Sequence, residues 1–197
     1  MTATHRVRRA KPDDMTAILD LINWSAKWLR EYKHTDQWAR PWPNERARDA
    51  RVRRGIKGGL TWMVEDHRGS LVGTVTYRGK GNQKLWTRRE LREPAVYVSR
   101  LIVAREHAGE HIGSALLDWA GQRGREQWDA ASTRVDVWTT NQGLHAYYLR
   151  NGFSHLRTRE FKDSWEYPSA ALFQKPTAAV DGASAARFEI EEAAYRP

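Results

Sequence analysis

The hydrophobic and polar positions along the chain predict short strands that alternate with amphipathic helices. Strands are expected at residues 5–9, 61–65, 71–77, 96–103, 133–141, 153–158 and 171–174, and residues 187–191 could add another. Helical spacing of apolar residues, or helix-forming composition, predicts helices near residues 15–28, 45–57, 112–120 and 144–150. The order β-α-α-β-β-β-α-β-α-β-β indicates one α/β domain built on a mixed sheet.

Polar connections separate these elements. Residues 33–44 form a proline-rich loop, and residues 78–94 form a polar connection that is long for a compact domain. After residue 176 the chain becomes small and polar, which is typical of a flexible segment. We therefore expect a single domain over residues 1–176, followed by a tail, 177–197, that is flexible or adds one strand.

The most informative stretch is a strand, a loop and a helix around residues 96–120. An apolar, β-branched run ends at Val103, a loop with Gly109 follows, and apolar positions recur at helical spacing from Ile112. The first amides of a helix have no acceptor inside it, and the helix dipole adds partial positive charge there. This arrangement favours an anionic ligand such as a pyrophosphate at the helix start.

Several segments of the chain, taken in order, resemble the GNAT superfamily of N-acyltransferases. They are Leu101–Val103, Gly109–Gly113, Asn141, Tyr148 and Asn151–Phe153. The resemblance implies the GNAT fold, a mostly antiparallel sheet of six or seven strands with helices on both faces. It also implies that the fourth and fifth strands splay apart, so that an acyl-CoA can place its pantetheine arm in the gap.

The resemblance assigns the donor, acetyl-CoA, to two parts of the central stretch and to the helix that follows. The fourth strand would offer backbone groups to the pantetheine arm, and loop amides would bind the pyrophosphate. The expected cofactor-binding residues are Leu101, Ile102, Val103, Ala108, Gly109, Glu110, His111, Ile112, Gly113, Ser114, Asn141 and Tyr148. For Asn141 the alternative is a helix N-cap, and for the strand residues it is ordinary core packing.

The pyrophosphate loop departs from the family pattern of Arg or Gln, two residues, Gly, one residue, and Gly or Ala. The matching positions hold Ala108, His111 and Gly113, so only the last conforms. His111 must then adopt a conformation that glycine reaches more cheaply. Glu106 and Glu110 would also repel phosphate. Backbone amides still allow binding, and the alternative for His111 is an exposed loop residue without a role.

Catalysis needs a base for the amine proton and an acid for the departing thiolate. The resemblance makes Tyr148 the acid, with a packed core tyrosine as the alternative. Asp136 is the candidate base, because it alternates with Val135 and Val137 and therefore faces away from them, either into the splay or to solvent. Rival bases or water-holding residues are Glu65, Tyr97 and Ser99.

Composition limits the alternatives. A 197-residue chain that is 40% hydrophobic and has ten tryptophans can fill one core. It has no cysteine, which excludes a thiol nucleophile and thiolate zinc ligands, and we expect no metal. No run has membrane-spanning length and the N-terminus lacks a secretory apolar segment, so a soluble cytoplasmic protein that does not bind membranes is the simplest expectation.

The net charge of +9 is concentrated in the first half of the chain. Residues 1–100 carry 22 Lys and Arg against 11 Asp and Glu, whereas residues 101–197 carry 11 against 13. The basic residues form two clusters: Arg46, Arg48, Arg51, Arg53, Arg54 and Lys57, and Arg78, Lys80, Lys84, Arg88, Arg89 and Arg92. Such clusters either bind polyanions or form a solvated surface.

Two functions follow from these features. The first is an acetyl-CoA-dependent N-acetyltransferase that acts on a small-molecule amine, selected by aromatic residues. Those residues are Trp28, Trp38, Trp42, Trp86 and Tyr97. The second is a GNAT-fold transferase whose donor is an aminoacyl-tRNA, held through the basic clusters. A non-enzymatic binding module is a third option. The resemblance leaves a homodimer open.

Overall fold

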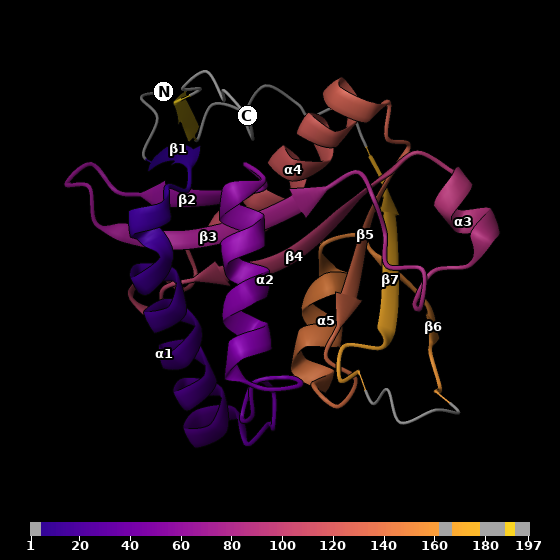
Figure 1. The fold of residues 1–197 in the computed structure, drawn as a ribbon, viewed down its shortest axis with the longest axis horizontal. Coiled ribbons are helices and arrows are strands. Elements are labelled where there is room, and N and C mark those ends of the chain that lie inside the picture. The colour runs from indigo at the N-terminus through magenta and orange to yellow at the C-terminus, as the bar shows by residue number, and fades with distance from the viewer. Residues whose placement is uncertain (1–4, 162–166, 178–187, 192–197) are drawn as a thin grey trace.

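The computed structural model describes residues 5–161, 167–177 and 188–191. Their strands form one eight-stranded sheet in the order β6-β7-β5-β4-β3-β2-β1-β8 (Figure 1). The strands are β1 (His5–Arg9), β2 (Thr61–Glu65), β3 (Leu71–Arg78), β4 (Ala95–Val103), β5 (Ser132–Val137), β6 (Ser154–Thr158), β7 (Ala171–Pro176) and β8 (Phe188–Glu191). Neighbouring strands are antiparallel except for the β4–β5 and β1–β8 pairs.

Five α-helices and two short 3-10 helices connect the described strands. They are η1 (Pro12–Asp14), α1 (Met15–Lys33), α2 (Glu45–Lys57), α3 (Arg88–Arg92), η2 (Arg105–His107), α4 (Ile112–Trp128) and α5 (Gln142–Arg150). Among the described residues, no helix is both long and apolar enough to cross a membrane. Asn44 caps α2 by accepting the Ala47 amide hydrogen at 2.9 Å, which explains why that polar segment begins a helix where it does.

Alternation along the strands sends side chains to two faces of the sheet. On one face, Val96, Val98 and Val135 pack with residues of α4 and α5, including Leu116 and Tyr148. On the other face, α1 and α2 cover Met63 and Ile102. A third, smaller cluster joins the connection before β4 to this second face, through Leu85, Trp86, Tyr97 and Leu172. The helices therefore cover both faces, as expected.

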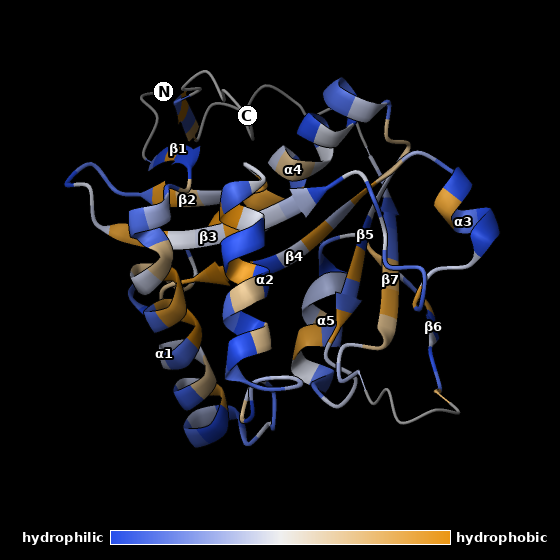
Figure 2. Ribbon diagram, viewed as in Figure 1, coloured by the Kyte–Doolittle hydropathy of each residue, from blue (hydrophilic) through white to orange (hydrophobic). Residues whose placement is uncertain are grey.

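Hydropathy along the ribbon follows this arrangement. β4 is hydrophobic over most of its length, whereas α2 and α3 carry mainly hydrophilic residues (Figure 2). Val52 and Ile56 are the large apolar side chains that α2 buries, so a narrow stripe is enough to dock this helix.

The predicted fold is confirmed, with two corrections. The sheet has eight strands rather than six or seven, because Phe188–Glu191 pairs in parallel with β1. Residues 78–94 are not one long loop, since they contain α3, whose N-cap Thr87 and Glu90 form a capping box. The tail predicted to be flexible lies mostly outside the described residues, and the single-domain boundary at residue 176 stays a prediction.

Candidate active site

The fourth and fifth strands separate halfway along their length. β4 pairs with β5 from Ala95 and Ser132 as far as Val98 and Val135, and the pairing stops there. β4 continues to Val103, paired with β3 on its other side. A register shift and the left-handed backbone of Arg100, φ 48°, mark a bulge where the strands part. The edge of Leu101–Val103 that faces β5 therefore has no partner among the described strands.

A cavity of about 230 Å³ lies at this separation. Its lining includes residues from both faces of the sheet, because Tyr148 belongs to the α5 side and Arg51 to the α2 side. Residues 37–42 of the α1–α2 loop border it as well. This loop is tied to the start of α5: Trp138 Nε1 and Thr140 Oγ1 both donate to Asp36 Oδ1, at 2.9 and 2.6 Å. These bonds hold the loop against the end of β5.

Asp136 points into the cavity. It is partly buried on β5 and accepts a hydrogen bond of 2.8 Å from the Tyr167 hydroxyl to its Oδ2 atom. Burial raises the pKa of Asp136 above its ordinary value, and the Tyr167 hydrogen bond and Arg78 oppose that rise. The carboxyl group thus has a higher affinity for a proton than an exposed aspartate, which suits a general base.

Tyr148 lines the same cavity and is otherwise buried. Its ring packs edge-on against Phe153 with centroids 5.2 Å apart and against Tyr147 at 5.5 Å. Burial raises the pKa of Tyr148 well above that of a free phenol, and the nearby Tyr147 and Asp136 raise it further. The hydroxyl therefore keeps its proton at neutral pH.

The loop before α4 presents backbone amides where an anion is expected. His111 is the N-cap of α4 and has φ 58° and ψ 19°, which confirms the glycine-like conformation predicted for it. The amides of Ile112, Gly113 and Ser114 lie in the first turn and have no acceptor inside the helix. At Gly113 an added Cβ would stand 2.6 Å from the Tyr147 hydroxyl oxygen, so a side chain does not fit there.

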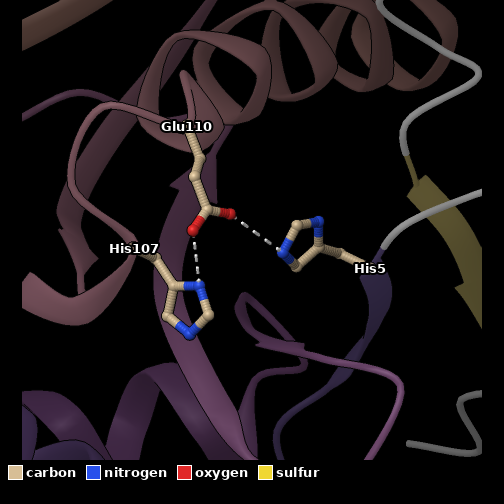
Figure 3. A group of neighbouring side chains, drawn as sticks. All are labelled: His5, His107 and Glu110. Atoms are coloured by element: carbon tan, nitrogen blue, oxygen red, sulfur yellow. Dashed lines mark hydrogen bonds and ion pairs between the residues drawn. The ribbon is translucent and has the colours of Figure 1, made fainter.

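Two histidines contact Glu110 of this loop. Its Oε1 lies 3.0 Å from His107 Nδ1, from which it accepts a hydrogen bond when that nitrogen carries the proton, and its Oε2 lies 3.8 Å from His5 Nε2 (Figure 3). His5, His107 and Glu110 each offer one atom that could bind a metal ion, and these three atoms lie within 4.8 Å of one another. The contacts of Glu110 with the two histidines account for the grouping without one.

Asn141 serves as the N-cap of α5. Its Oδ1 accepts the Leu144 amide hydrogen at 2.9 Å, and its Nδ2 donates to Gln37 Oε1 at 2.6 Å. This is the alternative that the sequence left open. Both ends of the side chain are engaged, and one Nδ2 hydrogen and one Oδ1 lone pair stay available for a further partner.

The predicted substrate residues are only partly brought together. Trp38 and Trp42 line the cavity, and Trp42 packs edge-on against Tyr167 with centroids 4.9 Å apart. Trp28 lies elsewhere on α1, stacked under Arg105 at 3.7 Å. The structure places Trp86 and Tyr97 in the core cluster beside α3, where their centroids are 5.5 Å apart.

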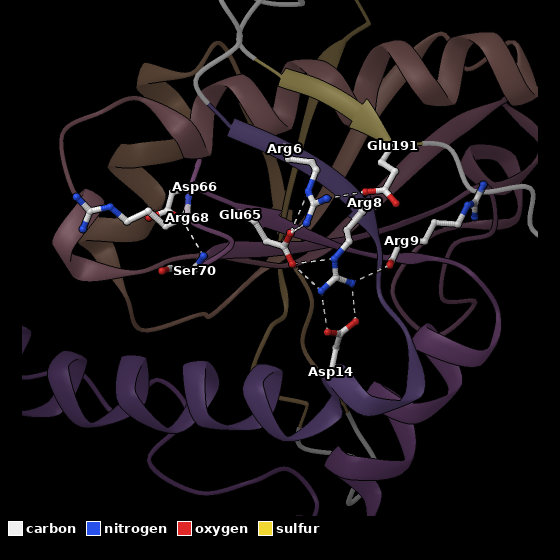
Figure 4. Close-up of polar contacts among 9 residues, drawn as sticks. All are labelled: Arg6, Arg8, Arg9, Asp14, Glu65, Asp66, Arg68, Ser70 and Glu191. Atoms are coloured by element: carbon white, nitrogen blue, oxygen red, sulfur yellow. Dashed lines mark hydrogen bonds and ion pairs between the residues drawn. The ribbon is translucent and has the colours of Figure 1, made fainter.

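The rival bases are placed differently. Ser99 lines the cavity, whereas Tyr97 accepts a 3.0 Å hydrogen bond from Arg134 in the core. Glu65 is bound by Arg6 and Arg8 at the opposite end of the sheet (Figure 4). The pKa of Glu65 is lowered because the hydrogen bonds from these arginines outweigh the effect of burial. A carboxylate that is paired in this way is a poor base.

The basic clusters divide according to burial. Nine of the twelve residues are exposed, whereas Arg48, Arg51 and Arg78 are partly buried and line the cavity. Arg100 joins them from the β4 bulge.

Sequence reasoning did not assign Arg100 or Tyr167 to the site. An arginine inside the apolar run of a central strand was the available signal for Arg100, because a charge is costly to bury without a purpose.

Comparisons with known proteins agree with this architecture. The model of the family described as "Acetyltransferase (GNAT) family" matches residues 20–153. The uncharacterized N-acetyltransferase YesJ of Bacillus subtilis is 24% identical over 146 residues, which cover 73% of this chain and 78% of YesJ.

Solved structures give the same result. A GNAT-family acetyltransferase from Listeria monocytogenes is 25% identical and superposes with a TM-score of 0.66, covering 87% of this chain and 94% of that one. Another from Streptococcus agalactiae is 16% identical with a TM-score of 0.65, covering 89% and 96%. The second likeness supports the fold alone.

Proposed function

This chain belongs to the acetyltransferase (GNAT) family of transferases, and from that premise we propose that it transfers an acetyl group from acetyl-CoA to a primary amine of a small molecule. The observation that carries the proposal is the separation of β4 from β5 beyond Val98 and Val135, with a cavity at the gap. An extended acyl-pantetheine arm can pair with the unpartnered edge of Leu101–Val103 as an added strand would.

The residues beyond that edge fit the rest of the donor. The first amides of α4 and the helix dipole attract a diphosphate. Gly113 lets the Tyr147 hydroxyl pack against the first turn of α4, and Glu110 contacts two histidines. When bound, acetyl-CoA supplies a thioester carbonyl and a thiolate leaving group.

Two side chains move the protons. Asp136 takes a proton from the attacking amine as the new carbon–nitrogen bond forms, and Tyr148 gives its proton to the sulfur as the carbon–sulfur bond breaks. Both residues line one cavity, which the reaction requires. The products are an amide and a free thiol, so atoms and charge balance once Asp136 returns its proton to Tyr148 through solvent.

The size of the cavity favours a small acceptor. Its volume of about 230 Å³ is below the several hundred Å³ that drug-sized ligands occupy. None of the relatives described above points to an aminoacyl-tRNA donor, and three residues of the basic clusters face the cavity rather than an outer surface. We therefore retain acetyl-CoA as the donor and a small amine as the acceptor.

The direct test combines donor binding with the Tyr148→Phe variant. Calorimetry should detect CoA binding to the wild type, and Tyr148→Phe should bind CoA nearly as well while kcat falls roughly 100-fold or more. Tyr32→Phe, at an exposed tyrosine of α1, is the matched control and should behave as the wild type. Absence of CoA binding at millimolar ligand would refute the proposal, and an unchanged kcat in Tyr148→Phe would remove its role as the acid.

The base is tested through the pH dependence of kcat/KM. Asp136 acts when ionised, so kcat/KM should fall as the pH drops through its raised pKa, which places the acidic limb above the pH of about 4 expected for an ordinary aspartate. Asp136→Asn should remove this limb. Tyr167→Phe should move it to higher pH, because the lost hydrogen bond favours the ionised carboxylate. If the acidic limb of the kcat/KM profile were identical in the wild type, Asp136→Asn and Tyr167→Phe, the base would be another group.

A further inference from the structure

The cavity collects positive charge beyond what binding a simple amine requires. Five arginines line it, namely Arg40, Arg48, Arg51, Arg78 and Arg100, and Asp136 is the one carboxylate among its described lining residues. Since an amine acceptor is itself a base that carries positive charge before it reacts, this excess of guanidinium groups calls for a separate explanation.

Arg48 is explained by local contacts. Its Nε donates to Asp49 Oδ1 at 2.8 Å, and its Nη1 donates to Asn23 Oδ1 at 3.1 Å. Arg40 is exposed. The remaining three, Arg51, Arg78 and Arg100, come from α2, β3 and the β4 bulge, so three different elements converge on one space.

Neutral oxygens accept the hydrogen bonds of two of these arginines, Arg51 and Arg100. Arg51 donates to the Trp42 carbonyl, and Arg100 Nε donates to Thr76 Oγ1 at 3.3 Å. The Nε atom of Arg78 is buried, and no described residue accepts its hydrogen. Within the described part of the chain, no ion pair joins any of the three to a carboxylate. Each guanidinium has five donors, and these hydrogen bonds use only a small part of that capacity.

The three charges also act on one another. Burial lowers the pKa of Arg100 to about 10, and the fields of Arg78 and Arg51 contribute to that fall. Burial and the neighbouring Arg54 and Arg48 lower the pKa of Arg51 as well. The groups stay charged at neutral pH, and their repulsion is retained in the fold. An anion between them would relieve it.

The approach of α2 keeps this arrangement tight. At Gly55 an added Cβ would lie 2.6 Å from Thr61 Oγ1 and 3.1 Å from Arg100 Nη2. Gly55 thus allows α2 to lie close against the Arg100 guanidinium, which a larger residue would displace. The arginines are positioned by the fold and do not extend freely into solvent.

We propose that the acceptor is a small amine that also carries an oxyanion, a carboxylate or a phosphonate, which Arg78 and Arg100 bind with help from Arg51 while Asp136 faces the amine. The inference rests on the proposed acetyltransferase function and specifies its substrate class. Guanidinium groups bind such oxyanions by paired, charge-assisted hydrogen bonds. Amines whose other groups are all cationic, such as polyamines, are repelled by the same residues.

The test compares matched acceptors. With saturating acetyl-CoA, release of the free thiol is measured for a panel of α-amino acids, their aminophosphonate analogues and their carboxamides, which keep the amine and the size but lose the anion. The best anionic acceptor should exceed its carboxamide in kcat/KM by at least about 30-fold. Carboxylate and phosphonate acceptors are ranked in the same assay, which distinguishes the two oxyanions. Equal kcat/KM for anion and carboxamide, or a preference for spermidine, would overturn the proposal.

Variants connect this preference to the arginines. Arg100→Met and Arg78→Met keep an unbranched apolar stem but remove the guanidinium group, and should each reduce the ratio of anion to carboxamide at least about 10-fold, mainly through the KM of the anion. Arg53→Met, at an exposed arginine of α2, should keep the ratio. A merely structural role would slow both acceptors together and leave the ratio unchanged, which would refute the assignment.

Calorimetry separates this inference from the proposed function. Binding of the best anionic acceptor, measured without CoA, should weaken at least about 10-fold in Arg100→Met. If CoA binds but no anionic amine does at millimolar concentration, the anion site is refuted and the transferase proposal stands. If the anion binds in an Arg100-dependent way but CoA does not, the anion site stands and the transferase proposal is refuted.

Discussion

The arginines of β1 and those of the cavity occupy opposite chemical surroundings in one sheet. On β1, Arg8 makes a two-pronged contact with Asp14, at 2.7 and 2.9 Å, and its Nε donates to Glu65 at 2.7 Å (Figure 4). At the separation of β4 and β5, Arg100 donates to the neutral Thr76 hydroxyl, and the buried Nε of Arg78 has no acceptor among the described residues. The first arrangement joins β1, β2 and the start of α1 through ion pairs, whereas no ion pair within the described chain involves Arg78 or Arg100.

This difference shows where the chain satisfies its charges and where it leaves them for a ligand. Removing a charge from water costs several kcal/mol, and a partner of opposite charge offsets that cost. The β1 cluster has its partners inside the protein, so it stabilises the fold. The cavity arginines have Asp136 as the one carboxylate in the described lining, so a ligand would have to supply most of the compensating charge. Similar residues therefore contribute to stability in one region and to recognition in the other.

The largest expected effect comes from breaking the β1 cluster. Arg8→Met would leave Glu65, whose side chain is 7% exposed, and Asp14, at 16%, without their shared cation. We expect the free energy of unfolding to fall by about 3 kcal/mol, measured by urea denaturation with tryptophan fluorescence. Arg68→Met, at an exposed turn residue, is the control and should unfold at the wild-type urea concentration. A fully stable Arg8→Met protein would show that the cluster does not hold the fold.

Acid should weaken the same cluster by a smaller amount. The hydrogen bond from Arg8 lowers the pKa of Asp14, and hydrogen bonds from Arg8 and Arg6 lower that of Glu65. Groups with lowered folded-state pKa values stabilise the fold above their ordinary pKa of about 4, and this contribution is lost as the pH falls through the folded values. The wild-type Tm should therefore drop below pH 4 more steeply than that of Arg8→Met. Parallel curves for the two proteins would contradict this origin of acid sensitivity.

The two regions also differ in how far the sequence could predict them. Helix α2 was predicted with its exact bounds, because Asn44 caps it and Gly58 follows it. The left-handed conformation of His111 followed from a comparison of the loop with the family pattern. Local chemistry determined these features, and local chemistry is visible in a sequence.

The composition of the cavity depends on contacts between distant segments, so it was harder to predict. Asp136 was correctly expected to face away from Val135 and Val137, but alternation could not distinguish the cavity from solvent. Its partner Tyr167 is 31 residues away along the chain. The bulge at Arg100 breaks the period on which strand prediction depends. Trp28 and Trp86 were expected among the substrate residues because their segments border the site. Both side chains pack elsewhere, which the sequence pattern did not indicate.

The smallest effect on stability is expected for Arg100→Met, and this variant tests most directly whether the cavity arginines differ from those of β1. Arg100→Met removes a positive charge that repels Arg78 and Arg51, which stabilises the fold. It also removes the hydrogen bond to Thr76 and the attraction to Asp136, which destabilises the fold. These contributions oppose one another, and we expect the free energy of unfolding to stay within about 0.5 kcal/mol of the wild type. Urea denaturation of Arg8→Met and Arg100→Met side by side measures the contrast.

Because a bound anion stabilises the folded state by mass action, adding the best anionic acceptor should raise the Tm of the wild type but much less that of Arg100→Met. If Arg100→Met were as unstable as Arg8→Met, both groups of arginines would be structural and the division between stability and recognition would be wrong.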